Sequence, residues 1–330
     1  MIINQPILSA IIPCYNLADF LPATIRSLRN LYNAEDCEFI FINDGSTDNT
    51  LSIIQDFAKN DKRVIVIDQK NSGVSAARNA AIEIAKGRYI LPLDGDDRLR
   101  PDAIETIKND INEADLLLAP SEIITTKKSY IPKHNIREGI YTPYDLYKSI
   151  TVFPTDPKLV YNTSIIRENN IRFDEDIHSG EVYTFTCHFL KYCNSIIVSN
   201  HCFYQYVMRE ASAIHAPNYI KDLSVLTIID RIISYSSASI CKLPSFNVTL
   251  FRMCTSFTYN KYAKLGLTNT EAQNVVSQML QHPLFKICLK KVACSCGTPV
   301  RDKLLALYVL TTRIYGYKLL ARLIRIINKS

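Results

Sequence analysis

The chain has 330 residues and a formal net charge of +6, with 47% hydrophobic and 21% charged residues. This composition is typical of a soluble globular protein with one large domain or two smaller ones. No apolar run reaches the ~18 residues that a membrane-spanning helix needs. The ten cysteines form no regular framework and follow no secretory signal. We therefore expect a cytoplasmic protein in a reducing compartment, and neither a spanning membrane protein nor a disulfide scaffold.

The amino-terminal half alternates short apolar runs with amphipathic segments. In chain order the predicted elements are a strand at 7–13, a helix at 19–29, a strand at 38–43, a helix ending at 59, a strand at 63–68, a helix at 75–84 and a strand at 89–93. This alternation predicts a parallel, doubly wound α/β sheet. Such sheets bind ligands just beyond the carboxyl ends of their strands.

Polar residues follow the second and third predicted strands. The run Asp44-Gly45-Ser46-Thr47-Asp48 combines a glycine turn with Ser, Thr and Asp side chains, which are predicted N-caps of the next helix. Beyond the third strand, Gly73 permits an unusual backbone angle and Ser75 is predicted to cap its helix. Arg78 at the start of this helix favours binding of an anion there.

Three carboxylates, Asp94, Asp96 and Asp97, follow the strand at 89–93. Carboxylates this close repel one another unless a cation or several hydrogen-bond donors share the site. An Asp-x-Asp pair at a strand end is therefore predicted to hold a divalent metal, which in turn holds a diphosphate. The alternative is a solvated turn, because Asp-Gly is common in turns.

These segments form four motifs in a fixed order. The motifs are Pro13-x-Tyr15-Asn16, Asn43-Asp44-Gly45-Ser46-Thr47-Asp48, Gly73-x-Ser75-x-x-Arg78-Asn79 and Leu93-Asp94-Gly95-Asp96-Asp97. Together they resemble the amino-terminal half of a family 2 glycosyltransferase with the GT-A fold. The resemblance implies a Rossmann-like, mostly parallel sheet flanked by helices. It also implies a nucleotide-sugar donor, usually a UDP-sugar, and inversion at the anomeric carbon.

The resemblance also implies roles for single residues. Pro13, Tyr15 and Asp44 line the pocket for the nucleotide base, and Arg78 lies near the ribose or diphosphate. The full set of implied donor-binding residues is Pro13, Tyr15, Asn16, Asp44, Ser75, Arg78, Asp94, Gly95 and Asp96.

The resemblance separates the three carboxylates by role. Asp94 faces the ribose or sugar, and Asp96 holds Mn²⁺ or Mg²⁺ against the diphosphate, with Asp97 as a neighbour. A metal there neutralises the charge that grows on the leaving nucleoside diphosphate.

The carboxyl half continues with a strand predicted around residues 116–119, followed by a polar loop. Residues 156–189 resemble the second conserved region of the family, including Lys158-Leu159-Val160-Tyr161 and the run at 171–175. Two positions depart from it. Asp156 replaces a Trp on which an acceptor sugar stacks, and Val182 replaces the Asp that is the expected general base.

An inverting transfer needs a base for the proton of the acceptor hydroxyl, so Glu181 becomes the candidate. Asp176, His178 and Glu175 are further candidates. The alternative for Glu181 is an acid favoured by the dipole at a helix start.

Tyr204-x-Tyr206 and the run from 209 to 212 resemble the end of the family's domain. There Arg209 is a candidate contact to the diphosphate and His215 to a metal or phosphate, with surface positions as the alternative.

The predicted domains are 1–216, the glycosyltransferase domain with a donor half to about residue 110, and 217–330, a helical extension. Helices are predicted at 223–235 and 251–265. In the last segment, Lys318, Arg322, Arg325 and Lys329 share one helix face opposite apolar residues. This basic amphipathic helix is predicted to bind an anionic membrane surface. The alternative is a helix packed on the core. No motif indicates nucleic-acid binding.

We therefore expect a metal-dependent, hexosyltransferase-type enzyme, peripheral to the inner face of the cell membrane. It is expected to transfer a sugar from a UDP-sugar to a lipid-linked or growing saccharide during surface polysaccharide synthesis. Val182 motivates one alternative, a non-catalytic nucleotide-sugar-binding module. A sugar nucleotidyltransferase is the other, but it needs a glycine-rich basic loop that residues 14–17 do not supply.

Overall fold

The computed structural model describes residues 5–132, 136–150, 158–177, 180–208, 219–254, 278, 281–296, 298–299, 302–303 and 306. The chain divides into two compact units. The first unit consists of Met1–Pro143, Pro154–Glu175 and Tyr192–Glu210, and the second of Tyr144–Phe153, Asp176–Lys191 and Ala211–Ser330. The second unit thus includes two segments that precede the predicted domain boundary at residue 216, and that boundary stays a prediction.

The first unit is built on an eight-stranded sheet with the order β3-β2-β1-β4-β10-β6-β11-β9. Its strands are β1 (Leu8–Cys14), β2 (Cys37–Asp44), β3 (Val64–Gln69), β4 (Tyr89–Pro92), β6 (Leu116–Ala119), β9 (Gly139–Tyr141), β10 (Lys158–Asn162) and β11 (Ile196–Val198). The four strands β1 to β4 pair in parallel. Every residue of β1 and β2 is buried, which is why these strands are mostly apolar without strict alternation.

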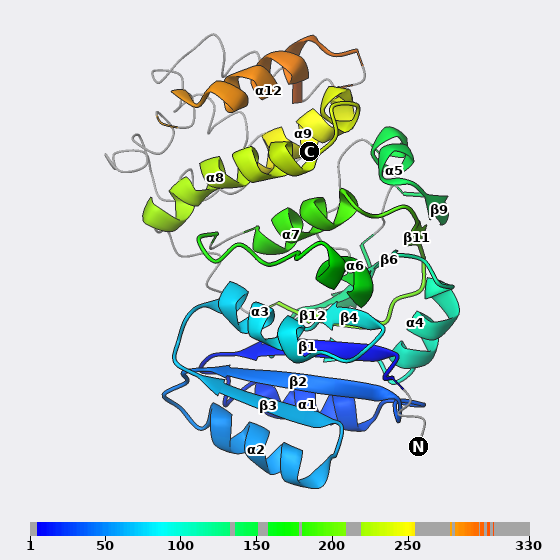
Figure 1. Cartoon of the computed structure of the whole chain (residues 1–330), viewed down its shortest axis with the longest axis vertical. Helices are drawn as coiled ribbons and strands as arrows, with labels where there is room; N and C mark the ends of the chain where they lie inside the picture. The colour runs from blue at the N-terminus through cyan, green and yellow to red at the C-terminus, as the bar shows by residue number, and fades with distance from the viewer. Residues whose placement is uncertain are drawn as a thin grey trace. The chain divides into compact units, whose positions relative to one another are not determined.

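Helices cover both faces of the parallel part of this sheet. They are α1 (Leu21–Arg29), α2 (Thr50–Asn60) and α3 (Val74–Ile84). Right-handed crossovers put α1 and α2 on one face, and because the strand order reverses after β3, α3 returns on the other, as Figure 1 shows. The point of reversal lies between β1 and β4, which is where ligands of such sheets bind.

An antiparallel strand, β10, is inserted between β4 and β6. Its Tyr161 pairs with Ile90 of β4, and its first residue, Lys158, pairs with Ala119 of β6. Because β10 runs against β4, its first residue lies beside the carboxyl end of β4. The insertion therefore brings a residue distant in sequence to the three carboxylates.

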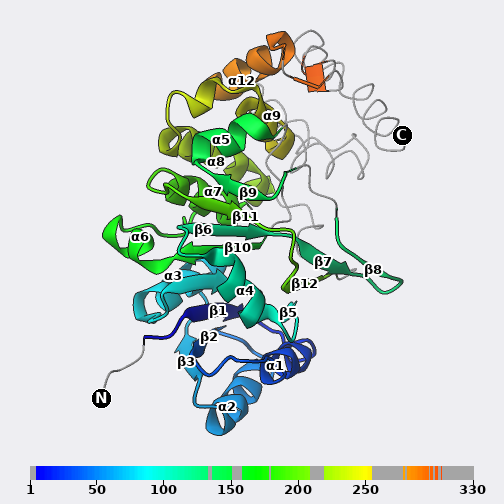
Figure 2. The ribbon, with the colours of Figure 1, turned by 90° about the vertical axis from the view of Figure 1, so that its right-hand side faces the viewer.

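A second, four-stranded sheet has the order β5-β12-β7-β8. Its strands are β5 (Arg98–Leu99), β12 (Tyr204–Val207), β7 (Ser121–Ile124) and β8 (Ser129–Tyr130). Figure 2 shows β12 beside β5 and β7, with β8 at the outer edge. The polar loop predicted after residue 119 is thus wrong in part, because β7 and β8 form there. The remaining helices of this unit are α4 (Ala103–Ile111) and α6 (Thr163–Glu168).

The described part of the second unit is helical. Its elements are α5 (Pro143–Ser149, whose first residue belongs to the first unit), α7 (Glu181–Leu190), α8 (Tyr219–Tyr235), η2 (Ile240–Lys242), α9 (Pro244–Cys254) and α12 (Pro283–Cys294). The Tyr147 ring of α5 packs edge-on against Phe246 of α9 at 5.7 Å between ring centroids. His188 of α7 stacks on Tyr235 of α8 at 4.1 Å.

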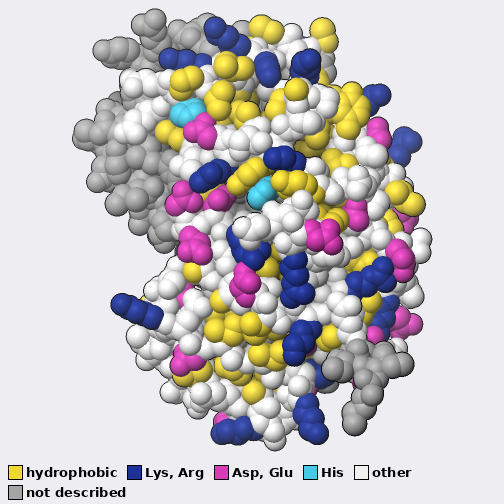
Figure 3. Space-filling view, in the orientation of Figure 1, with side chains coloured by type: hydrophobic (Ala, Val, Ile, Leu, Met, Phe, Trp, Pro, Cys, Tyr) yellow, Lys and Arg dark blue, Asp and Glu magenta, His cyan; other side chains and the backbone are white. Residues whose placement is uncertain are grey.

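The predicted helix at 223–235 lies within α8, and the beginning of the one at 251–265 forms the end of α9. The rest of that helix, and nearly all of the basic carboxyl-terminal helix, lie outside the described residues. Of the helices that the structure does describe, none combines the length and hydrophobicity required to span a bilayer. On the face seen in Figure 3, the basic and acidic side chains of the described residues are interspersed and form no single broad basic patch.

Candidate functional site

Three strand ends meet at one edge of the large sheet. Cys14 at the end of β1 pairs with Asn43 of β2, and Ile11 pairs with Pro92 at the end of β4. The loops that follow these strands therefore leave the sheet together. They carry the predicted donor-binding residues of the first, second and fourth motifs.

The loops after β1 and β2 are joined by side-chain hydrogen bonds. The backbone N–H of Asn16 donates to Ser46 Oγ at 3.0 Å, and Asn16 Oδ1 accepts from the N–H of Thr47 at 2.8 Å. Asp48 Oδ2 accepts from the N–H of Ala18 at 3.0 Å. Tyr15, just before Asn16 and beyond the end of β1, is 50% exposed.

The prediction that Ser46 and Thr47 cap the next helix is wrong. Both are bonded to the first loop, and Asn49 occupies the N-cap of α2 without a side-chain bond. Of the three predicted caps, Asp48 alone reaches the helix, where its Oδ1 accepts from the N–H of Thr50 at 3.0 Å.

Asp44 organises the loop between β3 and α3. Its carboxylate is buried and accepts hydrogen bonds from Gln69 Nε2 at 2.8 Å and from the backbone N–H groups of Ser72 and Gly73 at 2.9 Å each. The side chain of Asn71 donates to the backbone carbonyl of Asp44 at 2.9 Å. Asp44 thus fixes the third motif relative to the second.

The start of α3 differs from the prediction. Gly73, with φ +92°, occupies the N-cap, and Ser75 lies inside the helix. Its Oγ is buried and has no hydrogen-bond partner within the described part of the chain. Ser75 is therefore not the cap, because the bond from Gly73 to Asp44 decides where the helix begins.

Arg78 connects α3 to the carboxylates after β4. Its side chain is 4% exposed, and Nη2 lies 2.8 Å from Asp94 Oδ1. The guanidinium lies over the Phe173 ring, 5.2 Å from its centroid. Asn79 holds Phe173 there by bonds to both its carbonyl and its N–H, at 2.9 and 2.8 Å. Phe173 had no predicted role, although it lies in a stretch that resembles the family's second conserved region.

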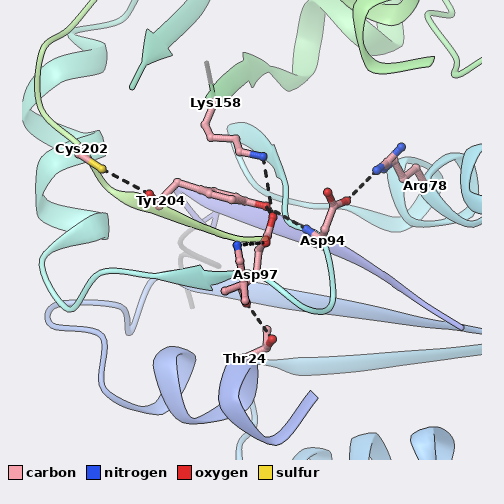
Figure 4. Close-up of polar contacts among 8 residues, drawn as sticks. Thr24, Arg78, Asp94, Asp97, Lys158, Cys202 and Tyr204 are labelled. Atoms are coloured by element: carbon pink, nitrogen blue, oxygen red, sulfur yellow. Dashed lines mark hydrogen bonds and ion pairs between the residues drawn. The ribbon is translucent and has the colours of Figure 1, made fainter. Parts of the chain in front are cut away.

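The turn after β4 is tightly packed. A Cβ at Gly95 would lie 2.7 Å from Leu17 Cδ1 and 2.9 Å from Cys14 Sγ, so a larger residue would require these side chains to move. The Thr24 hydroxyl lies 2.9 and 2.8 Å from the carbonyl oxygens of Gly95 and Asp97 (Figure 4). Asp94 and Asp96 remain half-buried. Burial, and then the charges of Asp96 and Asp94, raise the pKa of the Cys14 thiol well above its usual value.

The model of the family described as "Glycosyl transferase family 2" matches residues 9–204, which include all four motifs. The chain belongs to this family. Two relatives are longer proteins, of which the match covers only a part. The poly(ribitol-phosphate) beta-glucosyltransferase of Bacillus spizizenii is 31% identical over 237 residues, which are 70% of this chain and 37% of that protein. The chondroitin synthase of Pasteurella multocida is 44% identical over 100 residues, 30% of this chain and 10% of that protein. The chain thus spans little more than a third, at most, of the length of these relatives.

A solved structure confirms the fold. The structure of S. aureus TarS 1–349 in complex with UDP-GlcNAc matches with a TM-score of 0.73 at 19% sequence identity. The match covers 97% of this chain and 91% of that one. The predicted family 2 membership and GT-A fold are both confirmed.

In this family 2 chain, Asp97 has a different environment from its neighbours. It is fully buried, and its carboxylate accepts bonds from the Tyr204 hydroxyl at 2.6 Å and the Val207 N–H at 2.8 Å. Burial raises its pKa to about 7, and the positive charge of Lys158, 3.9 Å away, opposes that shift. Asp97 is therefore engaged inside the protein, not displayed beside Asp96.

The carboxylates permit a metal site that substrate completes. No group of three or more His, Cys, Asp or Glu side chains suited to a metal ion occurs among the residues described above. Mg²⁺ and similar ions are commonly held by one or two carboxylates together with substrate phosphates. Half-buried Asp96 is a carboxylate of the kind that such a site uses. Asp94 is half-buried as well and is paired with Arg78.

The remaining predicted residues are placed as follows. Glu181 is the first residue of α7 and Val182 the second, both in the second unit. Glu175 ends a segment of the first unit and is bonded to Asn79 at 3.1 Å. The predictions for His178, Arg209 and His215, and the departure at Asp156, lie outside the described residues.

Proposed function

We propose that this protein transfers a sugar, with inversion, from a UDP-sugar to a saccharide acceptor of a cell-surface polymer. The observation that carries the proposal is the gathering of Asp44, Arg78, Asp94 and Asp96 at one edge of the sheet, with Arg78 and Asp94 paired at 2.8 Å. The relatives support the donor and polymer classes. TarS has been solved with UDP and with UDP-GlcNAc, and the Bacillus relative is named for a poly(ribitol-phosphate) acceptor.

In this proposal the three loops hold different parts of the donor. The half-exposed Tyr15 ring stacks on the uracil beside Pro13, and the loop organised by Asp44 closes the base pocket. Arg78 directs Asp94 toward the ribose or sugar. Asp96 would hold Mn²⁺ or Mg²⁺, and the ion would neutralise the charge of the leaving UDP.

The proposed acceptor is a growing or lipid-linked saccharide at the cytoplasmic face of the membrane. Its hydroxyl must lose a proton as it attacks the anomeric carbon. Glu181 is the proposed base, since Val182 in the place of the family's Asp has no proton-accepting group. The basic segment at 318–329 is the proposed membrane contact, because clustered Lys and Arg attract anionic lipid.

The first prediction concerns the donor site. With a panel of UDP-sugars and Mn²⁺, the protein is expected to release UDP, and Asp96→Asn is expected to slow release at least ~100-fold because the leaving charge loses its counter-ion. Chelation of the metal should have the same effect. Asp56→Asn, on the exposed side of α2, is the matched control. If the rate of UDP release changed neither on chelation of the metal nor in Asp96→Asn, the proposal that Asp96 holds a metal would be wrong.

The second prediction concerns the base. Glu181→Gln is expected to keep UDP affinity but to slow transfer to an acceptor by ~10²–10⁴-fold, the usual contribution of a general base. In the Glu181→Gln background, Val182→Asp restores the family's acid and is expected to recover part of the rate. Full transfer by Glu181→Gln would exclude Glu181 as the base. Metal-dependent UDP binding without turnover of any donor would favour the binding-module alternative that Val182 suggests.

A further inference from the structure

Three segments distant in sequence converge beneath the donor carboxylates. They are the turn from Asp94 to Asp97, the start of β10 at Lys158, and β12 with Tyr204 and Val207 (Figure 4). The Tyr204 ring is fully buried. It comes from the small sheet, where its residue pairs with Leu99 of β5, two residues beyond Asp97.

The Tyr204 hydroxyl closes a ring of hydrogen bonds with this turn. It accepts from the backbone N–H of Asp94 at 3.2 Å and donates to Asp97 Oδ2 at 2.6 Å. The N–H of Asp97 in turn donates to the Asp94 carbonyl at 2.9 Å. The other carboxylate oxygen of Asp97 accepts from the N–H of Val207 at 2.8 Å. Both ends of the turn are therefore tied to β12.

Lys158 supplies the charge that this arrangement requires. A carboxylate as deeply buried as Asp97 is costly unless a counter-charge and hydrogen bonds compensate it. Lys158 Nζ lies 3.9 Å from Asp97 Oδ2, 4.0 Å from the centroid of the Tyr204 ring and 5.4 Å from that of Tyr206. The two aromatic faces favour the ammonium at this position.

We propose that Tyr204, Asp97 and Lys158 are positioning residues that hold Asp94 and Asp96 in the geometry for donor binding. The proposal rests on the proposed function for its catalytic consequence only. The position of the Asp94 backbone determines how its carboxylate is directed toward Arg78. It also determines where Gly95 and Asp96 lie. A displacement of about 1 Å in such a group costs roughly 100-fold in rate. The three residues contribute by fixing the turn, without contact to the donor.

The test compares two Tyr→Phe variants. Tyr204→Phe keeps the ring and removes the hydroxyl that bonds Asp94 and Asp97. Tyr89→Phe is the matched control, because Tyr89 is similarly buried and lies on the strand that leads to Asp94. Its hydroxyl has no hydrogen-bond partner among the residues that the structure describes. Hydrogen exchange of the Asp94 amide is expected to accelerate at least ~10-fold in Tyr204→Phe, since that amide loses its acceptor, and to stay unchanged in Tyr89→Phe.

The kinetic readout follows with a UDP-sugar and metal. Tyr204→Phe is expected to lower kcat/KM for the donor by ~10–100-fold, whereas kcat/KM of Tyr89→Phe should stay close to that of the unmodified protein.

Lys158→Met is the second variant, and it replaces Tyr204→Phe if that variant does not fold. Its control is Lys127→Met at an exposed lysine. Lys158→Met is expected to lower donor kcat/KM by ~10-fold or more. Unchanged Asp94 exchange in Tyr204→Phe, or unchanged donor kinetics in Lys158→Met, would overturn the proposal. Because exchange needs no donor, failure of the proposed function would appear separately, as absence of turnover in the unmodified protein.

Discussion

Arg78→Met is expected to lower kcat/KM for the UDP-sugar by ~100-fold or more, while the fold persists. Methionine keeps an unbranched side chain at this buried position, but it removes the guanidinium that binds Asp94 and lies over the Phe173 ring. Removing one partner of a buried ion pair costs ~3–5 kcal/mol, but Asp94 is 41% exposed and water replaces part of the lost bond. We therefore expect Arg78→Met to lower kcat/KM for the donor more strongly than it lowers the free energy of unfolding.

The matched control for this change is Arg88→Met. Arg88 lies just before β4, is 43% exposed and pairs with the exposed Glu113, so its loss is expected to change donor kinetics little. The kcat/KM of Arg78→Lys for the UDP-sugar is expected to lie between those of Arg78→Met and Arg88→Met. Lysine keeps the positive charge but lacks the planar guanidinium and its several N–H donors. Donor kinetics of Arg78→Met within a factor of about two of Arg88→Met would remove Arg78 from the proposed site.

Gly45→Ala is expected to reduce both the stability and the affinity for UDP. Gly45 has φ +68°, and a Cβ there would lie 2.5 Å from the backbone nitrogen of Asn71. The loop must then move, and the bonds from Ser72 and Gly73 to Asp44 are lost. Positive φ and broken buried bonds together are expected to cost ~2–4 kcal/mol of unfolding free energy. Chemical denaturation and UDP titration measure the two effects.

Gly45→Asn separates the two causes. Asparagine tolerates positive φ better than alanine does, but it carries the same Cβ toward Asn71. If the close approach dominates, both variants lose similar stability and UDP affinity. If Gly45→Asn instead kept both the stability and the UDP affinity, the positive φ of Gly45 would be the cause. The proposed clash with Asn71 would then be wrong.

The sequence was most informative where a feature depends on neighbours along the chain. The strands β1 and β2 are buried on both faces, so apolar residues dominate them without strict alternation. The polar residues beyond them could be placed at one edge, because parallel strands end on the same side of a sheet. Short strands such as β7 and β8 escaped prediction, since two to four partly exposed residues resemble a loop.

The residues that contact the site residues could not be predicted from the neighbouring sequence. Arg78 meets Phe173, and Asp97 meets Lys158 and Tyr204, through pairings that depend on how β10 and β12 insert. Ser75 failed as a helix cap for a related reason, because the bond between Gly73 and Asp44 joins residues 29 positions apart. Local propensity carries no information about such bonds.

The place of β10 in the large sheet also bears on how the first unit acquires its structure during synthesis. The strands β1 to β4 leave the ribosome before β10, so the outer edge of β4 stays unpaired until β10 (residues 158–162) has been made. An unpaired, apolar strand edge is a template for association with other chains. A fragment that stops before residue 158 would carry all four motifs and yet expose this edge. The minimal folding unit of the donor half is therefore longer than the stretch of sequence that encodes its chemistry.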